Sequence, residues 1–263
     1  MNTLTSKDGT TIAYENKGSG PAVIMVGGAL TTRLSGSRQQ LMDLLAETFA
    51  VYTYDRRGRG DSSDTLPYAL DREIEDLAAM IEVSGGRARV YGHSSGACLA
   101  LEAAAVLDDQ VTSLALYEAP YNDDPAAQPG WHRYLATMTK ALADGRRGDA
   151  VAAFMAEVGM PPEQIEGARH SPFWPFAEAI APTLAYDHVG AMRDGTVPVD
   201  RIASIGTPTL VLYGTASLPF MADTAATVAK AMPVATLRSL DGQTHDVDPA
   251  VLAPALTEFF AGR

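Results

Sequence analysis

The sequence predicts an α/β fold in which a mostly parallel sheet is flanked by helices and interrupted by a helical insertion. Short apolar runs alternate along the chain with segments of helical periodicity. The run over 22–26 contains no polar residue, which is typical of a parallel strand buried on both faces. Strand patterns then stop between residues 121 and 207, which indicates that an all-helical segment has been inserted into the alternation.

The elements before the central motif follow one another closely. An Asp8-Gly9 turn is typical of a hairpin. Apolar runs indicate the strands that follow, and apolar residues at helical spacing indicate the helices. The expected elements are a hairpin over 3–16, strands over 22–26 and 49–54, and helices over 38–47 and 70–83.

The loop over 55–62 carries Arg56, Arg57 and Arg59 between aspartates and glycines. Three arginines are compatible with phosphate binding. The alternation of Asp and Gly instead favours a structural loop bonded to itself. Arg33 lies near enough in the sequence to reach a pocket and contact a substrate carboxylate, but we expect it to form a surface ion pair.

The centre of the chain is Gly92-His93-Ser94-Ser95-Gly96, preceded by a β-prone run over 87–91 and followed directly by an alanine- and leucine-rich helix. A strand, Gly-x-Ser-x-Gly and a helix in that order are typical of a nucleophile elbow, a sharp turn that exposes a serine hydroxyl. Glycines at 92 and 96 allow the backbone segments of such a turn to approach each other.

The second half of the chain repeats the alternation around the insertion. We expect a strand over 111–117 that ends at Glu118, a helical stretch over 125–195, and a strand over 208–214. A helix over 221–231, a strand over 235–240 and a loop over 242–246 follow. The last helix begins with Asp248 as its N-cap and Pro249 at its first position.

Composition narrows the class of partner. The formal net charge is -12, which disfavours nucleic acid and anionic membranes and leaves a small molecule as the expected partner. The single cysteine, Cys98, allows no internal disulfide, and no signal-peptide pattern or apolar span is evident. We expect a cytoplasmic monomer or homodimer with no cofactor, and no metal because no cluster of ligands has metal-binding spacing.

At this point the sequence resembles the α/β-hydrolases over nearly its whole length. The likeness rests on Val26-Gly27-Gly28-Ala29, on the loop over 54–62, on the elbow around Ser94 and on the late His245. It implies an eight-stranded, mostly parallel sheet, with a core formed by 1–120 and 197–263 and a helical cap over 121–196. A serine at the elbow differs from the aspartate that typical dehalogenases and epoxide hydrolases carry there.

Two residues carry the expected chemistry. Ser94 is the candidate nucleophile and needs a base within hydrogen-bond reach. His245 is the candidate base, because it follows the last strand in a loop that can fold back over the elbow. His93 adjoins Ser94 but is expected to support packing or a loop, and the other three histidines fall in the cap.

Several carboxylates are candidates for the acid. Most members of the resembled family place it after the strand that ends at Gly214, and this chain has no carboxylate there. Glu118 closes the strand that follows the elbow helix, an arrangement that resembles some haloalkane dehalogenases, and a carboxylate there is costly unless paired. Glu118 is therefore preferred and Asp223 is the alternative. Further alternatives are Asp123, Asp124, Asp246 or no acid at all.

An oxyanion hole requires two backbone N–H donors. Ser95, the residue after the nucleophile, is expected to supply one. The other is expected from the loop after the strand over 22–26, with Ala29 preferred and Gly28 second.

The substrate pocket is expected between the sheet and the cap. Aromatic side chains are the candidates to line it, although at least half of them are expected only to pack the cap onto the core. The candidates are Tyr121, Trp131, Phe173, Trp174, Phe176, Tyr186 and Phe220. They would form a mainly apolar pocket.

The resemblance together with these residues implies a serine hydrolase that cleaves a carboxylic ester or lactone of a small, mainly apolar molecule through an acyl-enzyme on Ser94. Two alternatives stay open. One is non-hydrolytic chemistry on the same fold, such as cyclisation or cofactor-free perhydrolysis. The other is a ligand-binding protein with a vestigial triad.

Overall fold

A computed structural model describes residues 1–262 and contains one eight-stranded sheet of order β1-β2-β4-β3-β5-β6-β7-β8. Pairing is antiparallel from β1 through β2 to β4 and parallel across the rest of the sheet. The strands are β1 (Asn2–Thr5), β2 (Thr11–Lys17), β3 (Ala22–Val26), β4 (Ala50–Tyr54), β5 (Ala88–His93), β6 (Val111–Tyr117), β7 (Thr209–Gly214) and β8 (Ala235–Leu240). The predicted mostly parallel, eight-stranded sheet is confirmed.

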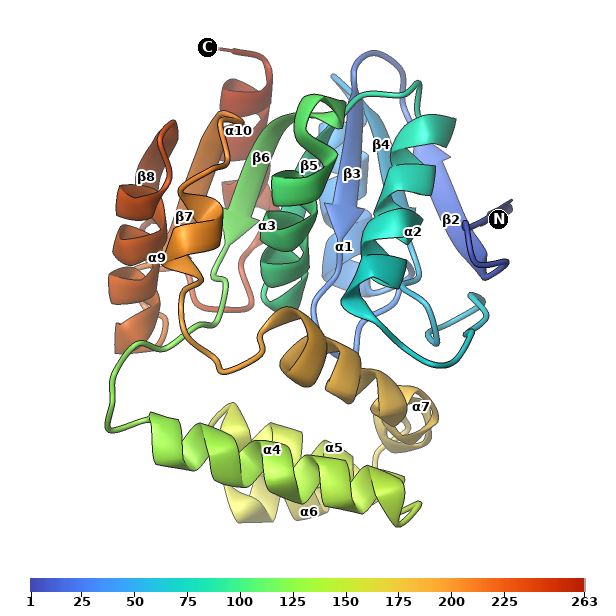
Figure 1. Ribbon diagram of the computed structural model, residues 1–263, viewed down its shortest axis with the longest axis vertical. Helices are drawn as coiled ribbons and strands as arrows, with labels where there is room; N and C mark the ends of the chain where they lie inside the picture. The colour runs from blue at the N-terminus through green and yellow to red at the C-terminus, as the bar shows by residue number, and fades with distance from the viewer. Residues whose placement is uncertain (263) are drawn as a thin grey trace.

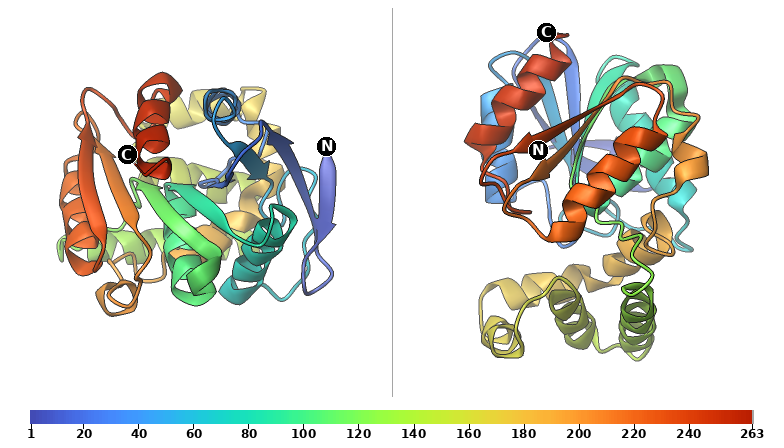
Figure 2. Two further views of the ribbon diagram at one scale, coloured as in Figure 1. Left: turned by 90° about the horizontal axis from the view of Figure 1, so that it is seen from above. Right: turned by 90° about the vertical axis from the view of Figure 1, so that its left-hand side faces the viewer.

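Helices cover both faces of the sheet (Figure 2). On one face pack α1 (Gly36–Leu45) and α10 (Pro249–Phe260). On the other face pack α2 (Leu70–Val83), α3 (Ser95–Leu107), α8 (Val199–Ile202) and α9 (Pro219–Ala231). The N-cap of α10 is as predicted, since the Asp248 carboxylate accepts a hydrogen bond of 2.8 Å from the Ala250 N–H.

Strand β3 shows why an uninterrupted apolar run fits this architecture. Successive side chains of a strand point to opposite faces. Val23 and Met25 enter the core beneath α1 and α10, whereas Ile24 and Val26 enter the core beneath α2 and α3. Every residue of β3 is buried, so neither face tolerates a polar side chain.

Residues 128–191, between β6 and β7, form a separate layer of helices below the sheet in Figure 1. It contains α4 (Gln128–Ala143), α5 (Arg147–Glu157), α6 (Pro162–Arg169), α7 (Phe173–Ile180), the 3₁₀-helix η2 (Ala181–Thr183) and the π-helix η3 (Tyr186–Ala191). These helices have their own apolar core, built around Tyr134, Met138, Val151 and Trp174. The predicted helical insertion is present. Its treatment as a cap with boundaries at 121 and 196 stays a prediction.

The parallel strands bring the predicted functional residues to one edge of the sheet. Ser94 follows β5, Glu118 follows the neighbouring β6, and His245 follows β8. The Ser94 N–H donates to the Tyr117 carbonyl, which aligns the ends of β5 and β6. Functional residues of open α/β sheets gather at this carboxyl edge. Within residues 1–262, no helix is long and apolar enough to cross a membrane.

Candidate active site

Ser94 occupies a tight turn between β5 and α3 with φ 57° and ψ -131°. A residue other than glycine is strained at positive φ, and such backbone strain concentrates at functional sites. A Cβ at Gly92 would lie 2.6 Å from Ala97 Cα, and a Cβ at Gly96 would lie 2.5 Å from the Val26 carbonyl oxygen. Both glycines are therefore required by close backbone approach, as the sequence predicts.

A chain of hydrogen bonds joins Ser94, His245 and Glu118. His245 Nε2 lies 2.9 Å from Ser94 Oγ, and His245 Nδ1 lies 2.7 Å from Glu118 Oε2. The imidazole thus contacts the serine with one nitrogen and the carboxylate with the other. This is the geometry in which a carboxylate orients a histidine that takes the proton of a serine.

Glu118 is buried and its carboxylate is held at both oxygens. Oε1 accepts a hydrogen bond of 2.8 Å from the Gly214 N–H, and Oε2 accepts one of 2.8 Å from Ser217 Oγ. The segment after β7, where the sequence lacks the acid expected from the resemblance, therefore supplies donors to Glu118. A buried carboxylate with several donors and a histidine partner avoids the cost of an unpaired charge.

The alternative acids lie elsewhere. Asp223 is exposed on α9. Asp123 accepts a hydrogen bond from the Val197 N–H, and Asp124 accepts one from the Ala126 N–H. Asp246 stays on the rim beside His245 without replacing Glu118 as the partner of the imidazole.

The loop after β3 approaches the nucleophile from the side. A Cβ at Gly28 would lie 2.9 Å from Ser94 Cβ. The Gly28 carbonyl accepts hydrogen bonds from Arg59 Nη1 at 2.6 Å and Thr31 Oγ1 at 2.8 Å. Because C=O and N–H point in opposite directions in a trans peptide, these bonds turn the Ala29 N–H away from Arg59 and Thr31. Ser95 begins α3, where backbone N–H groups lack helical acceptors.

Comparison with known proteins agrees with this arrangement of strand, elbow and helix. A model of the Alpha/beta hydrolase family matches residues 23–256. The chain belongs to the alpha/beta hydrolase family.

Related proteins cover this alpha/beta hydrolase along nearly its whole length. An alpha/beta hydrolase from Sphaerobacter thermophilus is 49% identical, with a TM-score of 0.88 over 98% of this chain and 100% of that chain. A 2-(acetamidomethylene)succinate hydrolase of Mesorhizobium japonicum is 26% identical over 95% of this chain and 91% of its own. A non-heme chloroperoxidase of Streptomyces lividans is 29% identical over 98% and 99%, respectively.

Two side chains outside the triad hold the loop that carries His245. His93 Nε2 lies 2.9 Å from the His245 carbonyl oxygen, and Tyr117 Oη donates to the Thr244 carbonyl at 2.5 Å. Burial, with a further contribution from His245, lowers the pKa of His93 to about 3. The neutral ring therefore donates through Nε2–H. His93 has the loop-supporting role that the sequence suggests, whereas nothing in the sequence pointed to Tyr117.

A cavity of about 640 Å³ opens above Ser94 and His245 in this alpha/beta hydrolase. The candidates Trp131 and Phe220 line it, and so do Gly28 and Ala29, the candidates for the oxyanion hole. Further lining residues come from both layers and were not predicted. They include Asn122, Gln128, Phe154, Glu157, His188, Met192 and Leu218.

Four of the candidate pocket aromatics are not among the residues that line the cavity. Tyr121 is fully buried in the core with α3. Trp174 and Phe176 pack inside the inserted helices, where Arg169 also covers the Trp174 ring at 4.8 Å. Phe173 is 42% exposed. The apolar face of α7 packs within its own layer and not toward the sheet.

Tyr186, considered with them, does not line the cavity either. Its ring stacks on Tyr68 with centroids 3.9 Å apart, and its hydroxyl donates to Asp64 at 2.6 Å. Its contacts join η3 to the segments that precede α2.

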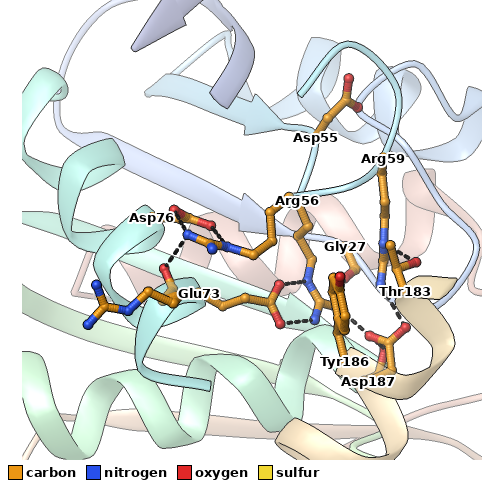
Figure 3. A network of polar contacts seen from close by, with 12 residues as sticks. Gly27, Asp55, Arg56, Arg59, Glu73, Asp76, Thr183, Tyr186 and Asp187 are labelled. Carbon is orange, nitrogen blue, oxygen red and sulfur yellow. Dashed lines mark hydrogen bonds and ion pairs between the residues drawn. The ribbon is translucent and has the colours of Figure 1, made fainter. Parts of the chain in front are cut away.

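The arginine loop forms a buried network that ties the inserted helices to the core (Figure 3). Arg56 pairs with Glu73 and Asp187, and Arg59 pairs with Asp187 at 2.6 Å. Although burial acts to raise the pKa of Asp187, the two arginines hold it below its usual range. Ser95 Oγ also donates to Asp187 at 2.8 Å, so the network reaches the residue next to the nucleophile.

The loop is structural, as expected, but it is not bonded only to itself. Its arginines pair with carboxylates on α2 and η3, which leaves no free guanidinium for a phosphate. Arg33 forms ion pairs, as predicted, with Asp55 and Asp61. Its side chain is buried, so the predicted surface location is wrong.

Proposed function

We propose that this protein is a serine hydrolase that cleaves a carboxylic ester or lactone of a small, uncharged, mainly apolar molecule. The observation that carries the proposal is the hydrogen-bonded chain Ser94–His245–Glu118 at the floor of the cavity. Such a chain lets a serine hydroxyl act as a nucleophile, which an isolated serine does only poorly.

Acylation follows from the two contacts of the imidazole. Ser94 Oγ attacks the ester carbonyl carbon while His245 Nε2 takes the hydroxyl proton. Glu118, bonded to Nδ1–H, stabilises the imidazolium that forms. Collapse of the tetrahedral intermediate breaks the bond to the leaving alkoxy oxygen, which receives the proton from His245.

Deacylation repeats the sequence with water. His245 Nε2 takes a proton from water as the water oxygen attacks the acyl carbon, and then returns a proton to Ser94 Oγ as the carboxylic acid leaves. In both halves the negative oxygen is held by backbone N–H groups. The hydrogen bonds at the Gly28 carbonyl favour the Ala29 N–H as one donor, and the start of α3 favours the Ser95 N–H as the other.

The cavity wall supports an uncharged substrate. The cavity is lined by apolar and aromatic side chains together with Glu157 and Asp246 at its rim. Among residues 1–262, no lysine or arginine lines it. A substrate carboxylate would therefore meet like charge without a cationic partner.

A fluorophosphonate that reacts with activated serines tests the proposal. We expect one adduct, which peptide mass spectrometry places on Ser94, and no adduct in the Ser94→Ala variant. A folded protein that stays unlabelled while its cavity admits the probe would refute the hydrolase and favour a ligand-binding protein.

Perhydrolysis is a second candidate, because a bifunctional esterase/perhydrolase of Acinetobacter calcoaceticus is 30% identical over 49% of this chain. Hydrogen peroxide would replace water as the nucleophile on the same acyl-enzyme, giving a peroxy acid and free Ser94. Competition between water and hydrogen peroxide for one ester separates the two: a peroxy acid formed in excess of the carboxylic acid would favour perhydrolysis.

A further inference from the structure

His188 is a cavity residue for which the reaction described above has no use. It lies in the π-helix η3 and lines the cavity from the side of the inserted helices. Its side chain is only 4% exposed. Short π-helical segments are costly and are found frequently at functional sites.

One nitrogen of His188 is occupied and the other is free. Nδ1 lies 2.9 Å from the Tyr134 hydroxyl. No hydrogen bond to Nε2 is present within residues 1–262, and the ring lines the cavity. Most other polar side chains of the wall are already engaged: Ser217 with Glu118, Thr31 with Gly28, and Gln128 with Asn122. A nine-tenths buried ring with a free polar atom is costly unless a ligand completes it.

The ring is neutral. Burial lowers the pKa of His188 to about 4, although the neighbouring Asp187 acts in the opposite direction. A neutral imidazole exposes a single N–H or a single lone pair at Nε2. A hydroxyl group can bind Nε2 in either form, because a hydroxyl both accepts and donates hydrogen bonds.

Aromatic side chains pack around the His188 ring. Trp131 meets the His188 ring edge-on with centroids 5.7 Å apart, and Phe154 lies 5.4 Å away. Both also line the cavity, and the Trp131 N–H is taken by the Arg193 carbonyl. The wall around His188 is therefore mainly aromatic, and it fits a flat or aliphatic group that carries one polar substituent facing the ring.

The position of the ring is fixed relative to the nucleophile. Asp187, next in the chain, accepts hydrogen bonds from Ser95 and Arg59 at 2.8 and 2.6 Å. Figure 3 shows this carboxylate between η3 and the arginine loop. A ligand held by His188 is thus held at a constant distance from the elbow, which is what positioning of a substrate requires.

We propose that His188 Nε2 binds an uncharged hydroxyl on the part of the substrate that lies against Trp131 and Phe154. The substrate class becomes a hydroxylated ester, with a phenol or alcohol group distant from the scissile bond. This inference rests on the proposed hydrolase function for its meaning, but its binding step does not require Ser94 chemistry.

The kinetic test uses matched neutral esters. Methyl 3-arylpropanoates and 2-arylethyl acetates are compared with phenyl, 3-hydroxyphenyl, 4-hydroxyphenyl and 4-fluorophenyl as the aryl group. We expect at least one hydroxyaryl ester to exceed its phenyl parent about tenfold in kcat/KM, because the parent leaves a buried polar atom unpaired. In His188→Phe the ratio of kcat/KM between the hydroxyaryl ester and its phenyl parent falls to about one. In Tyr134→Phe this ratio takes a value between those of the wild type and of His188→Phe.

His170→Phe is the matched control, since His170 is exposed on the inserted helices and lies outside the cavity. It should keep the wild-type ratio. Hydroxyaryl and phenyl esters that differ less than twofold throughout, or a preference that survives in His188→Phe, would overturn the proposal.

A second measurement separates this proposal from the catalytic one and does not depend on how His188→Phe folds. In Ser94→Ala protein with ¹⁵N-labelled histidine, the preferred hydroxyaryl ester should shift the His188 Nε2 resonance and the phenyl parent should not. Such a shift without turnover in the wild type would refute the hydrolase and keep the His188 site. Turnover through Ser94 without a resonance shift and without a preference for the hydroxyaryl ester would keep the hydrolase and refute the His188 site.

Discussion

Ser94 and Glu118 share a feature that links the fold to the chemistry. Both adopt positive φ, 57° and 47°, although neither is glycine. They follow the neighbouring strands β5 and β6, and His245 contacts both. Backbone strain of this kind persists only where surrounding contacts enforce it. At Glu118 the N–H donates to the Leu212 carbonyl, and Gly214 and Ser217 hold the carboxylate.

Glu118→Gln tests the assignment of the acid. The amide keeps the volume of the side chain but cannot stabilise an imidazolium as a carboxylate does, so kcat should fall roughly 10³- to 10⁴-fold. Ester hydrolysis and circular dichroism would be measured together. Asp223→Asn, on the exposed face of α9, is the control and should match the wild type. Full activity in the glutamine variant would remove Glu118 from the mechanism.

His188 also predicts a pH dependence of stability. Its folded-state pKa of about 4 lies below the usual value, so the unfolded chain binds more protons between pH 4 and about 6.5. The contribution of His188 is therefore fully present above about pH 6.5 and is lost as pH falls. Replacing His188 by Phe should shrink the difference in unfolding free energy between pH 7 and pH 5 by about 2 kcal/mol. Urea unfolding at both pH values measures this, and an unchanged difference would show that the ring is not buried neutral.

At the scale of elements, the order of strands and helices was predictable because each has a local signature. The apolar run of β3 and the Asp248–Pro249 start of α10 are such signatures. The end of α1 was placed two residues too late, since Thr48 and Phe49 both donate to the Leu45 carbonyl and turn the chain toward β4. Local periodicity does not encode such a turn.

The partners of buried charges were not predictable, because they come from distant parts of the chain. Arg59 and Asp187 are 128 residues apart, and nothing near Asp187 marks it as the anchor of η3. The position of the aromatic side chains of α7 was not predictable for the same reason. Their helical spacing indicates an apolar face but not which layer that face meets.

Asp187→Asn should weaken the joint between the inserted helices and the core. Arg56 and Arg59 would lose the carboxylate that pairs with both while remaining buried, which typically costs about 3–5 kcal/mol. Urea unfolding would report the loss. Asp200→Asn, at an exposed position in α8, should change the free energy of unfolding by less than about 0.5 kcal/mol. Equal stability of the two variants would mean that the network does not hold the layers together.

At the scale of the whole molecule, the cavity lies between the carboxyl edge of the sheet and the inserted helices. The sequence located the sheet side of the site, where Ser94, Glu118 and His245 stand at strand ends. It did not locate the other wall, because the lining residues Phe154 and His188 are set by how the helices pack. The net charge of -12 and the acidic side chains that line the cavity repel anionic molecules that approach the site.

This charge pattern predicts selection against anionic substrates. A 4-nitrophenyl ester with a terminal methyl group should exceed its counterpart with a terminal carboxylate by about tenfold or more in kcat/KM at low salt. The gap should narrow at 1 M salt and in Glu157→Gln, whereas Glu166→Gln, on exposed α6, should preserve it. A carboxylate ester hydrolysed equally fast would contradict an uncharged substrate.

The most direct test of the central claim is to trap the acyl-enzyme. Rapid acid quenching of the wild-type protein with a 4-nitrophenyl ester, followed by peptide mass spectrometry, should find the acyl group on Ser94. A burst of 4-nitrophenol equal to the enzyme concentration should accompany it. Turnover without an acylated Ser94, or acylation of any other residue, would contradict the account.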